Sequence, residues 1–198
     1  MHPTSSGCPC NIPCKMVGQN SPFMQNGEPI RFKRGEVLWS QYDPAEFLVV
    51  VCTGSIKLTL EWPGEREPIM ALVHRGGLIG EEAAVEGARR GATCTAIASG
   101  RGLRVRREEL RRMLRRNPQL NEHLLSTACA RLSNFSQRIE ELNQGSVEHR
   151  LAKVLLRVGD EVGLTDARGV FVPLRLTRGD LADLVGCRVA SARSVRRA

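Results

Sequence analysis

The sequence predicts an α+β protein in which an antiparallel β-barrel or sandwich precedes a long helix and a C-terminal helix-turn-helix. Between residues 31 and 101, short runs of Val, Ile, Leu and Thr are punctuated by glycines and an Asp-Pro pair. Apolar residues then recur at spacings of three and four through 118–144, and residues 176–198 have helix-turn-helix spacing. Short strands with frequent turn signals favour a barrel or sandwich, and the change of period marks the helical half.

The composition is that of a globular protein with a basic excess. The 198 residues are 41% hydrophobic and 25% charged, and the net charge is +8. Arginine supplies most of this excess, which favours a polyanionic partner such as nucleic acid. No apolar run reaches the roughly 18 residues of a membrane span, and the first residues lack the order of a signal peptide. We therefore expect no membrane contact and a cytoplasmic location.

The N-terminal segment, residues 1–30, lacks a hydrophobic period, so we expect a poorly ordered Cys-containing arm. Three cysteines stand close together in it: Cys8, Cys10 and Cys14. The other four lie singly in apolar segments: Cys52, Cys94, Cys129 and Cys187. Cysteine in such segments usually acts as a small buried hydrophobe, so the sequence does not indicate a disulfide framework.

A heptad seam is predicted on the long helix at residues 118–144. Its members alternate at spacings of three and four: Leu125, Ala128, Leu132, Phe135, Ile139 and Leu142. Such a seam can pack on the chain's own barrel or on a second copy of the chain. We favour a dimerisation helix, because two-fold symmetry suits a DNA-binding protein.

Further helices and one strand flank this seam. Residues 101–116 hold eight Arg and two Glu, and "RREELRRMLRRNP" predicts a helix ended by Pro118. A solvated helix face explains this Arg-rich stretch better than a nucleic-acid patch. After a hinge-like break at residues 143–146, an amphipathic helix opens at Ser146. The segment "GVFVPLRL" predicts a strand or hairpin arm that Pro173 limits to a sheet edge.

The stretch "LTRGDLADLVGC" predicts the first helix and the turn of a helix-turn-helix. Thr177 followed by Asp180 is a capping-box-like start. Ala182 is small where two helices cross closely, and Gly186 permits the positive φ of a sharp turn. An ordinary helical hairpin is the alternative. A second helix would enter the major groove of double-stranded DNA. The candidate DNA-contacting residues are Thr177, Arg178, Arg188, Ser191, Arg193, Arg196 and Arg197.

The order of these elements resembles the cAMP receptor protein / fumarate-nitrate reduction regulator (CRP/FNR) family of bacterial transcription regulators, over residues 30–198. Three stretches carry the resemblance: "RFKRGEVLWSQYDPAEFLVVVCTGSIKL", "GGLIGEEAAVEGARRGATCTAIA" and "LTRGDLADLVGC". It implies a cyclic-nucleotide-binding-like β-roll, which is a jelly-roll barrel, as a sensor domain at residues 31–117. It further implies a winged helix-turn-helix domain at 145–198, a homodimer on a palindromic DNA site, and RNA polymerase as a further partner.

The resemblance also implies an effector pocket. Members that bind cAMP use a Gly-Glu pair for the ribose and an Arg-Ser pair for the cyclic phosphate, and Gly80, Glu81 and Arg90 fit three of these positions. A cyclic nucleotide is therefore a candidate cofactor. Gly91 stands in place of the Ser, which removes a donor, and Phe135 falls near the position of a polar group that meets the base. In the alternative, Glu81 and Arg90 form a structural ion pair.

An iron–sulfur cluster is a second candidate cofactor. The oxygen-sensing branch of the family holds such a cluster with four Cys thiolates. The corresponding metal ligands would be Cys8, Cys10 and Cys14, with Cys94 or Cys52 as the distant fourth. Their spacing is tighter than that of the branch, so a zinc or thiol-redox site and an incidental arm stay open.

The second helix of the helix-turn-helix departs from the family pattern. Ala190 replaces a Glu and Ser194 an Arg that read base edges, while Arg193 stands one place early. The sequence ends at Ala198, before the family's wing, so we expect an incomplete module. An effector-binding or dimerisation protein that no longer reads DNA specifically is therefore the alternative function.

No spacing of His, Cys, Ser or Asp residues suggests a catalytic site, so we expect that the protein is not an enzyme.

Overall fold

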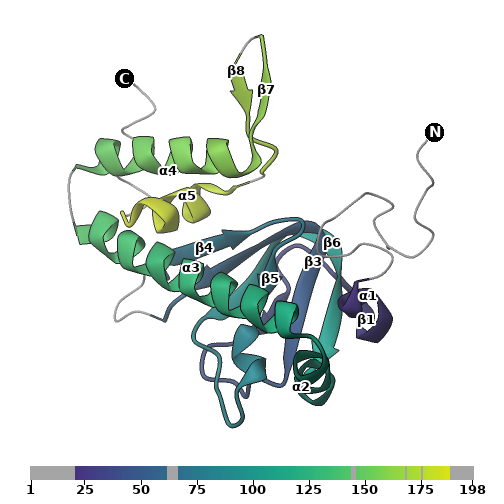
Figure 1. Ribbon diagram of the computed structural model, residues 1–198. Helices are drawn as coiled ribbons and strands as arrows, with labels where there is room; N and C mark the ends of the chain where they lie inside the picture. Colours follow the sequence, from purple (N-terminus) through teal and green to yellow (C-terminus); the bar gives the residue numbers. More distant parts are fainter. Residues whose placement is uncertain (1–20, 62–66, 144–145, 168, 175, 188–198) are drawn as a thin grey trace.

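The computed structural model describes residues 21–61, 67–143, 146–167, 169–174 and 176–187. The first half of the chain contains α1 (Pro22–Asn26), β1 (Glu28–Phe32), β2 (Val37–Trp39), β3 (Phe47–Thr59), β4 (Ile69–Val73), β5 (Leu78–Ile79), the 3₁₀ turn η1 (Glu81–Ala84) and β6 (Thr93–Arg106). The second half contains α2 (Arg107–Arg116), α3 (Pro118–Asn143), α4 (Val147–Val162), β7 (Leu164–Asp166), β8 (Gly169–Phe171) and α5 (Arg178–Val185). Figure 1 shows α3 running across the β-strands, with α4, α5 and the β7–β8 hairpin beyond one end. The expected α+β fold, a β-roll followed by a long helix, is confirmed.

The β-roll is built around its two longest strands. The sheet order is β1-β6-β3-β4, with β2 on β6 and β5 on β3, and every pairing is antiparallel. Alternate residues of a strand point to opposite sides, and in β3 both sides are buried. Leu48 and Val50 enter a cluster with Leu103, whereas Val49 and Val51 enter a separate cluster on the other side. The continuous apolar run of β3 thus serves two cores.

The N-terminal arm is shorter than expected. Within residues 1–30, α1 and the start of β1 are folded, so the expectation of an arm through residue 30 was wrong for residues 22–30. The Ser21 hydroxyl caps α1 by accepting the Phe23 N–H, and Phe23, 2% exposed, packs into the cluster that contains Leu103. β1 pairs with β6. One anchoring aromatic residue and the backbone pairing of a short strand produce no hydrophobic period in the sequence. The periodicity therefore gave no sign that residues 22–30 are folded. Residues 1–20 lie outside the described residues.

The helix α2 covers one end of the β-roll. Leu110 and Met113 are buried and join the cluster that also holds Leu120 and Leu124 of α3. Arg112, Arg115 and Arg116 are exposed and Arg111 pairs with Glu86 at 2.7 Å, whereas Arg107 donates to the Ala45 carbonyl of the β-roll. The expected helix face thus holds for α2, which has an apolar underside, but not for Arg101, Arg104 and Arg106, which lie in β6.

The C-terminal half has a small core that also takes in Ile69 and Leu72 of β4. Val154 and Val158 of α4 pack with Ala182 and Leu184 of α5, and Ile69 of β4 is fully buried in the same cluster. The helices of the described part are all too short or too polar to cross a membrane.

Candidate effector site and nucleic-acid interface

A tight turn gathers the candidate effector residues. β5 ends at Ile79, and Gly80 then takes a left-handed conformation, with φ of 86°, before η1 begins at Glu81. A Cβ at Gly80 would lie 2.6 Å from Nη1 of Arg90. Because only glycine fits both the conformation and the space, the turn can bring η1 against Arg90.

Arg90 is buried as a charged group. It is 1% exposed, its Nη2 donates to the Phe47 carbonyl at 2.5 Å, and its guanidinium carbon lies 4.0 Å from the centroid of the Trp39 ring. Burial lowers the pKa of Arg90, while the neighbouring Glu82 carboxylate opposes that shift. The aromatic faces and the carbonyl stabilise the cation only in part, and Nε and Nη1 have no hydrogen-bond partner in the described part of the chain.

Glu81 and Arg90 do not pair with each other. The Glu81 carboxylate accepts Nη1 of Arg131 at 2.6 Å, and Nη2 of Arg131 donates to the Leu78 carbonyl at 2.6 Å. Burial raises the pKa of Glu81, and Arg131 opposes the shift. Arg90 instead faces Glu82, whose Oε2 lies 3.6 Å from its Nη1. The alternative in which Glu81 and Arg90 form an ion pair with each other is therefore wrong in its partners. Through these two contacts Arg131 joins the turn to α3.

The candidate metal site cannot be assembled from the described residues. Cys94 lies in β6 with its thiol buried in the β-roll core, and burial raises the pKa of that thiol. A thiol held neutral in an apolar cluster is a poor metal ligand. Within the described ranges, His, Cys, Asp and Glu form no group of three that could hold a metal ion. Cys52, the alternative fourth ligand, is also buried, in β3, and the remaining candidates, Cys8, Cys10 and Cys14, lie outside the described residues.

The predicted seam of α3 divides between two faces. Leu125, Leu132 and Ile139 are 66%, 69% and 47% exposed and recur every seven residues. In contrast, Phe135 packs on the β-roll cluster that contains Trp39, and Ala128 and Leu142 are half-buried. The inner members pack on the chain itself, and the outer members form an exposed apolar stripe.

The start of the helix-turn-helix has the geometry that its sequence predicts. The Thr177 hydroxyl accepts the Asp180 N–H at 3.0 Å, and the Asp180 carboxylate accepts the Thr177 N–H at 2.9 Å, which completes a capping box. Gly186 ends α5 in the left-handed conformation, with φ of 68°. Thr177 and Arg178 are exposed at the start of α5, whereas Arg188, Ser191, Arg193, Arg196 and Arg197 lie outside the described residues.

Two basic side chains missed in the sequence join α5 to the rest of the molecule. Lys57 of β3 donates to Asp180 at 2.8 Å. Arg138 of α3, 1% exposed, donates to the carbonyls of Ile69 in β4 and of Leu184 in α5. Cations near the last carbonyls of a helix are favourable, because those carbonyls lack partners within the helix. Each residue looks like an ordinary surface charge in the sequence, so no sequence signal marks Arg138 as buried or Lys57 as half-buried.

The comparisons with known proteins agree with this architecture. Residues 29–117 match the family model described as the cyclic nucleotide-binding domain. A CRP-like cAMP-activated global transcriptional regulator of Mycobacterium tuberculosis is 26% identical over 171 residues, which are 86% of this chain and 75% of that protein. A global nitrogen regulator of Synechococcus elongatus is 24% identical over 158 residues, 79% of this chain and 71% of the relative.

Solved structures share the fold. FixK2 from Bradyrhizobium japonicum has a TM-score of 0.75 and 18% identity, over 86% of this chain and 83% of that one. The c-di-GMP responsive global regulator CLP of Xanthomonas campestris has a TM-score of 0.74 and 20% identity, over 89% and 87%. A β-roll of the cyclic nucleotide-binding class, a long helix and a capped helix-turn-helix start define a class of transcription regulator. The chain therefore carries a cyclic nucleotide-binding domain over residues 29–117, and it is similar in sequence and in fold to transcription regulators of the CRP/FNR family.

Proposed function

We propose that this transcription regulator is a homodimer that binds a palindromic DNA site, with the β-roll as its regulatory domain. The observation that carries the proposal is α5, capped at Thr177 and turned at a left-handed Gly186, at the end of a β-roll and long helix. DNA as the partner also favours a cytoplasmic location.

The exposed stripe on α3 supports the dimer. Leu125, Leu132 and Ile139 lie on one helix face, one heptad apart, and each exposes roughly half or more of its surface. Apolar side chains spaced one heptad apart can contribute to a seam shared by two helices. A second copy of the chain would bury these side chains on its own α3, and two-fold symmetry would then present two reading modules.

The start of α5 supports DNA as the partner. Thr177 and Arg178 are exposed there, at the positive end of the helix dipole, where phosphate oxygens bind well. Arg188, Ser191, Arg193, Arg196 and Arg197 follow in the sequence and would complete the contact surface with polar and basic side chains. A protein of net charge +8 gains further affinity from the phosphate backbone.

Arg193→Ala tests whether the module reads DNA. We expect the full-length variant to lose roughly tenfold in affinity for a selected site, measured by fluorescence anisotropy, while its affinity for unrelated DNA changes little. Unchanged affinity for both would favour the alternative, an effector-binding or dimerisation protein whose helix-turn-helix does not read DNA.

A cyclic nucleotide is the candidate effector that the residues of the predicted effector pocket support. Gly80, Glu81 and Arg90 are gathered at one turn, and the matching domain family and the cAMP-activated relatives point the same way. Titration of the protein with cAMP tests this proposal. A calorimetric Kd in the micromolar range would support it, and the absence of heat at millimolar cAMP would refute it.

A further inference from the structure

A cradle for an anion lies at the centre of the turn after β5. The buried guanidinium of Arg90 forms one side of it, with Nε and Nη1 lacking a hydrogen-bond partner among the described residues. The backbone N–H of Gly91 forms the other side. Donors gathered around a buried cation favour a negatively charged acceptor, because a buried charge is costly unless an opposite charge balances it.

The chain places its own carboxylate in this cradle. Oε1 of Glu82 accepts the Gly91 N–H at 3.3 Å, and Oε2 lies 3.6 Å from Nη1 of Arg90. The neighbouring carboxylate, Glu81, is committed to Arg131 at 2.6 Å. Glu82 is therefore the acid that balances the charge of Arg90.

The side chain of Glu82 reaches the cradle from the solvent side. It is 37% exposed, whereas the side chain of Arg90 is 0% exposed. The contact between Oε2 and Nη1 is longer than a hydrogen bond, so the carboxylate neutralises Arg90 without saturating its donors. A shorter residue at position 82 would leave a path from solvent to an uncompensated guanidinium.

We propose that Glu82 is an internal anion that fills this cradle and excludes external phosphate and carboxylate groups from Arg90. This inference rests on the proposed regulatory role of the β-roll. A second anion beside Glu82 would meet like-charge repulsion close to the buried guanidinium, where screening is weak. Glu82 thus determines specificity: an anionic effector has to displace it, whereas an uncharged effector does not.

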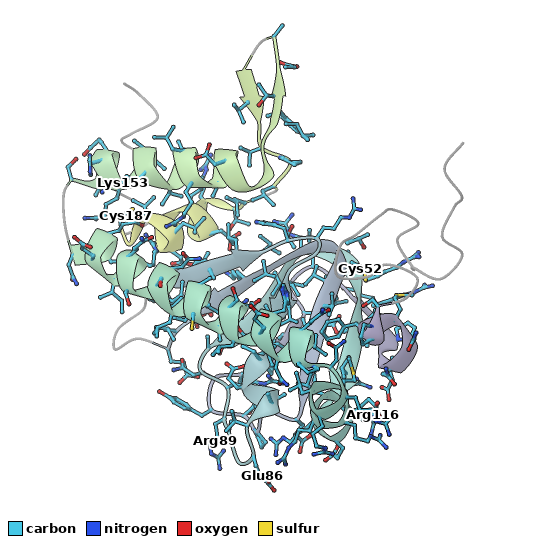
Figure 2. The ribbon with its side chains drawn as sticks, viewed as in Figure 1. Cys52, Glu86, Arg89, Arg116, Lys153 and Cys187 are labelled. Atoms are coloured by element: carbon cyan, nitrogen blue, oxygen red, sulfur yellow. The ribbon has the colours of Figure 1, made fainter. Side chains whose placement is uncertain are left out.

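Removal of the carboxylate tests the proposal. We would compare the full-length wild type with Glu82→Ala and with the matched control Glu86→Ala, at the outer edge of the same segment in Figure 2. Glu86 is 76% exposed and pairs with Arg111, away from Arg90. Thermal midpoints would be recorded against inorganic phosphate, with chloride at equal ionic strength as the reference.

The expected result is a selective response to phosphate. Phosphate at about 10 mM should raise the midpoint of Glu82→Ala by roughly 2–4 °C through preferential binding to the folded state. For the wild type and for Glu86→Ala, the midpoint in phosphate should differ from the midpoint in chloride by less than about 0.5 °C. An equal response of wild type and Glu82→Ala, or no response of either, would overturn the proposal.

Two additions keep the test decisive. Glu82→Gln keeps the shape of the side chain without its charge. It replaces Glu82→Ala if circular dichroism shows that Glu82→Ala does not fold.

Titration with cAMP distinguishes a nucleotide phosphate from free phosphate, and we expect Glu82→Ala to bind cAMP at least about tenfold more tightly than the wild type. Tight cAMP binding by the wild type that Glu82→Ala does not improve would also overturn the proposal. DNA affinity is measured separately, so failure of the DNA-binding proposal would not affect these results.

Discussion

Lys57 of β3 and Asp180 of α5 form an ion pair of 2.8 Å across the boundary between the β-roll and the helix-turn-helix. Their side chains are 18% and 9% exposed, so water screens the pair little. Asp180 also completes the cap of α5. One carboxylate therefore both caps α5, the first helix of the proposed reading module, and fixes it to the β-roll.

Replacement of Lys57 should weaken this connection. Lys57→Met removes the cation but keeps an apolar stem of similar length, which leaves the Asp180 carboxylate without its charged partner. We expect a loss of about 1–2 kcal/mol in the free energy of unfolding, measured by urea denaturation. Lys33→Met, at an exposed turn of the β-roll, is the matched control and should change this free energy by less than about 0.5 kcal/mol. Equal effects of the two variants would contradict this assignment.

Acid should loosen the same contact. Burial raises the pKa of Asp180, but hydrogen bonds from Lys57 and Thr177 outweigh it and hold the pKa below its usual 3.8. The ion pair therefore stabilises the fold fully above about pH 4, and this stability is lost as the pH falls through the lowered pKa. Asp180→Asn keeps a capping oxygen without the charge. Between pH 5 and pH 3, the wild type should lose more unfolding free energy than this variant.

Arg138 should contribute more to the free energy of unfolding than the exposed arginines of the chain do. It joins α3 to β4 and α5 through the Ile69 and Leu184 carbonyls and also donates to Glu141. Arg138→Met would leave buried carbonyls without a donor, and we expect a loss of about 3 kcal/mol in thermal or urea unfolding. Arg116→Met, at the exposed end of α2 labelled in Figure 2, is the control and should cost little. A loss below about 1 kcal/mol for Arg138→Met would show that these contacts contribute little.

The outer stripe of α3 should control the oligomeric state. Leu132→Glu places a charge at the middle of the stripe, and we expect the dimer dissociation constant to rise by about 30-fold or more. Sedimentation velocity measures this change. Leu156→Glu is the matched control, because Leu156 is 70% exposed on α4 and lies outside the stripe. A wild type that is monomeric at micromolar concentration would contradict the proposed dimer.

Features encoded within a few residues were predictable from the sequence. The capping box of Thr177 and Asp180 and the left-handed Gly186 depend on local backbone geometry, so residue type and spacing were sufficient. The strand-rich β-roll and the length of α3 followed from hydrophobic period in the same way.

Features that depend on distant partners were not predictable. Glu81 and Glu82 are adjacent, and only the turn after Gly80 decides which of them faces Arg90 and which faces Arg131. The six apolar positions of the seam have one helical period, and only the fold divides them between the chain's own core and the exposed stripe. Arg138 has the sequence pattern of a solvated charge, yet it is buried because carbonyls from two other elements converge on it.

Selection of DNA sites from a random pool by the purified full-length protein tests the central claim most directly. A dimer that reads DNA should enrich a palindrome whose half-sites lie about 10 base pairs apart, centre to centre. Binding to it should weaken steeply as salt is raised, because phosphate contacts release counterions. Enrichment of no motif, with equally weak retention of every sequence, would contradict the account of this protein as a sequence-specific DNA-binding regulator.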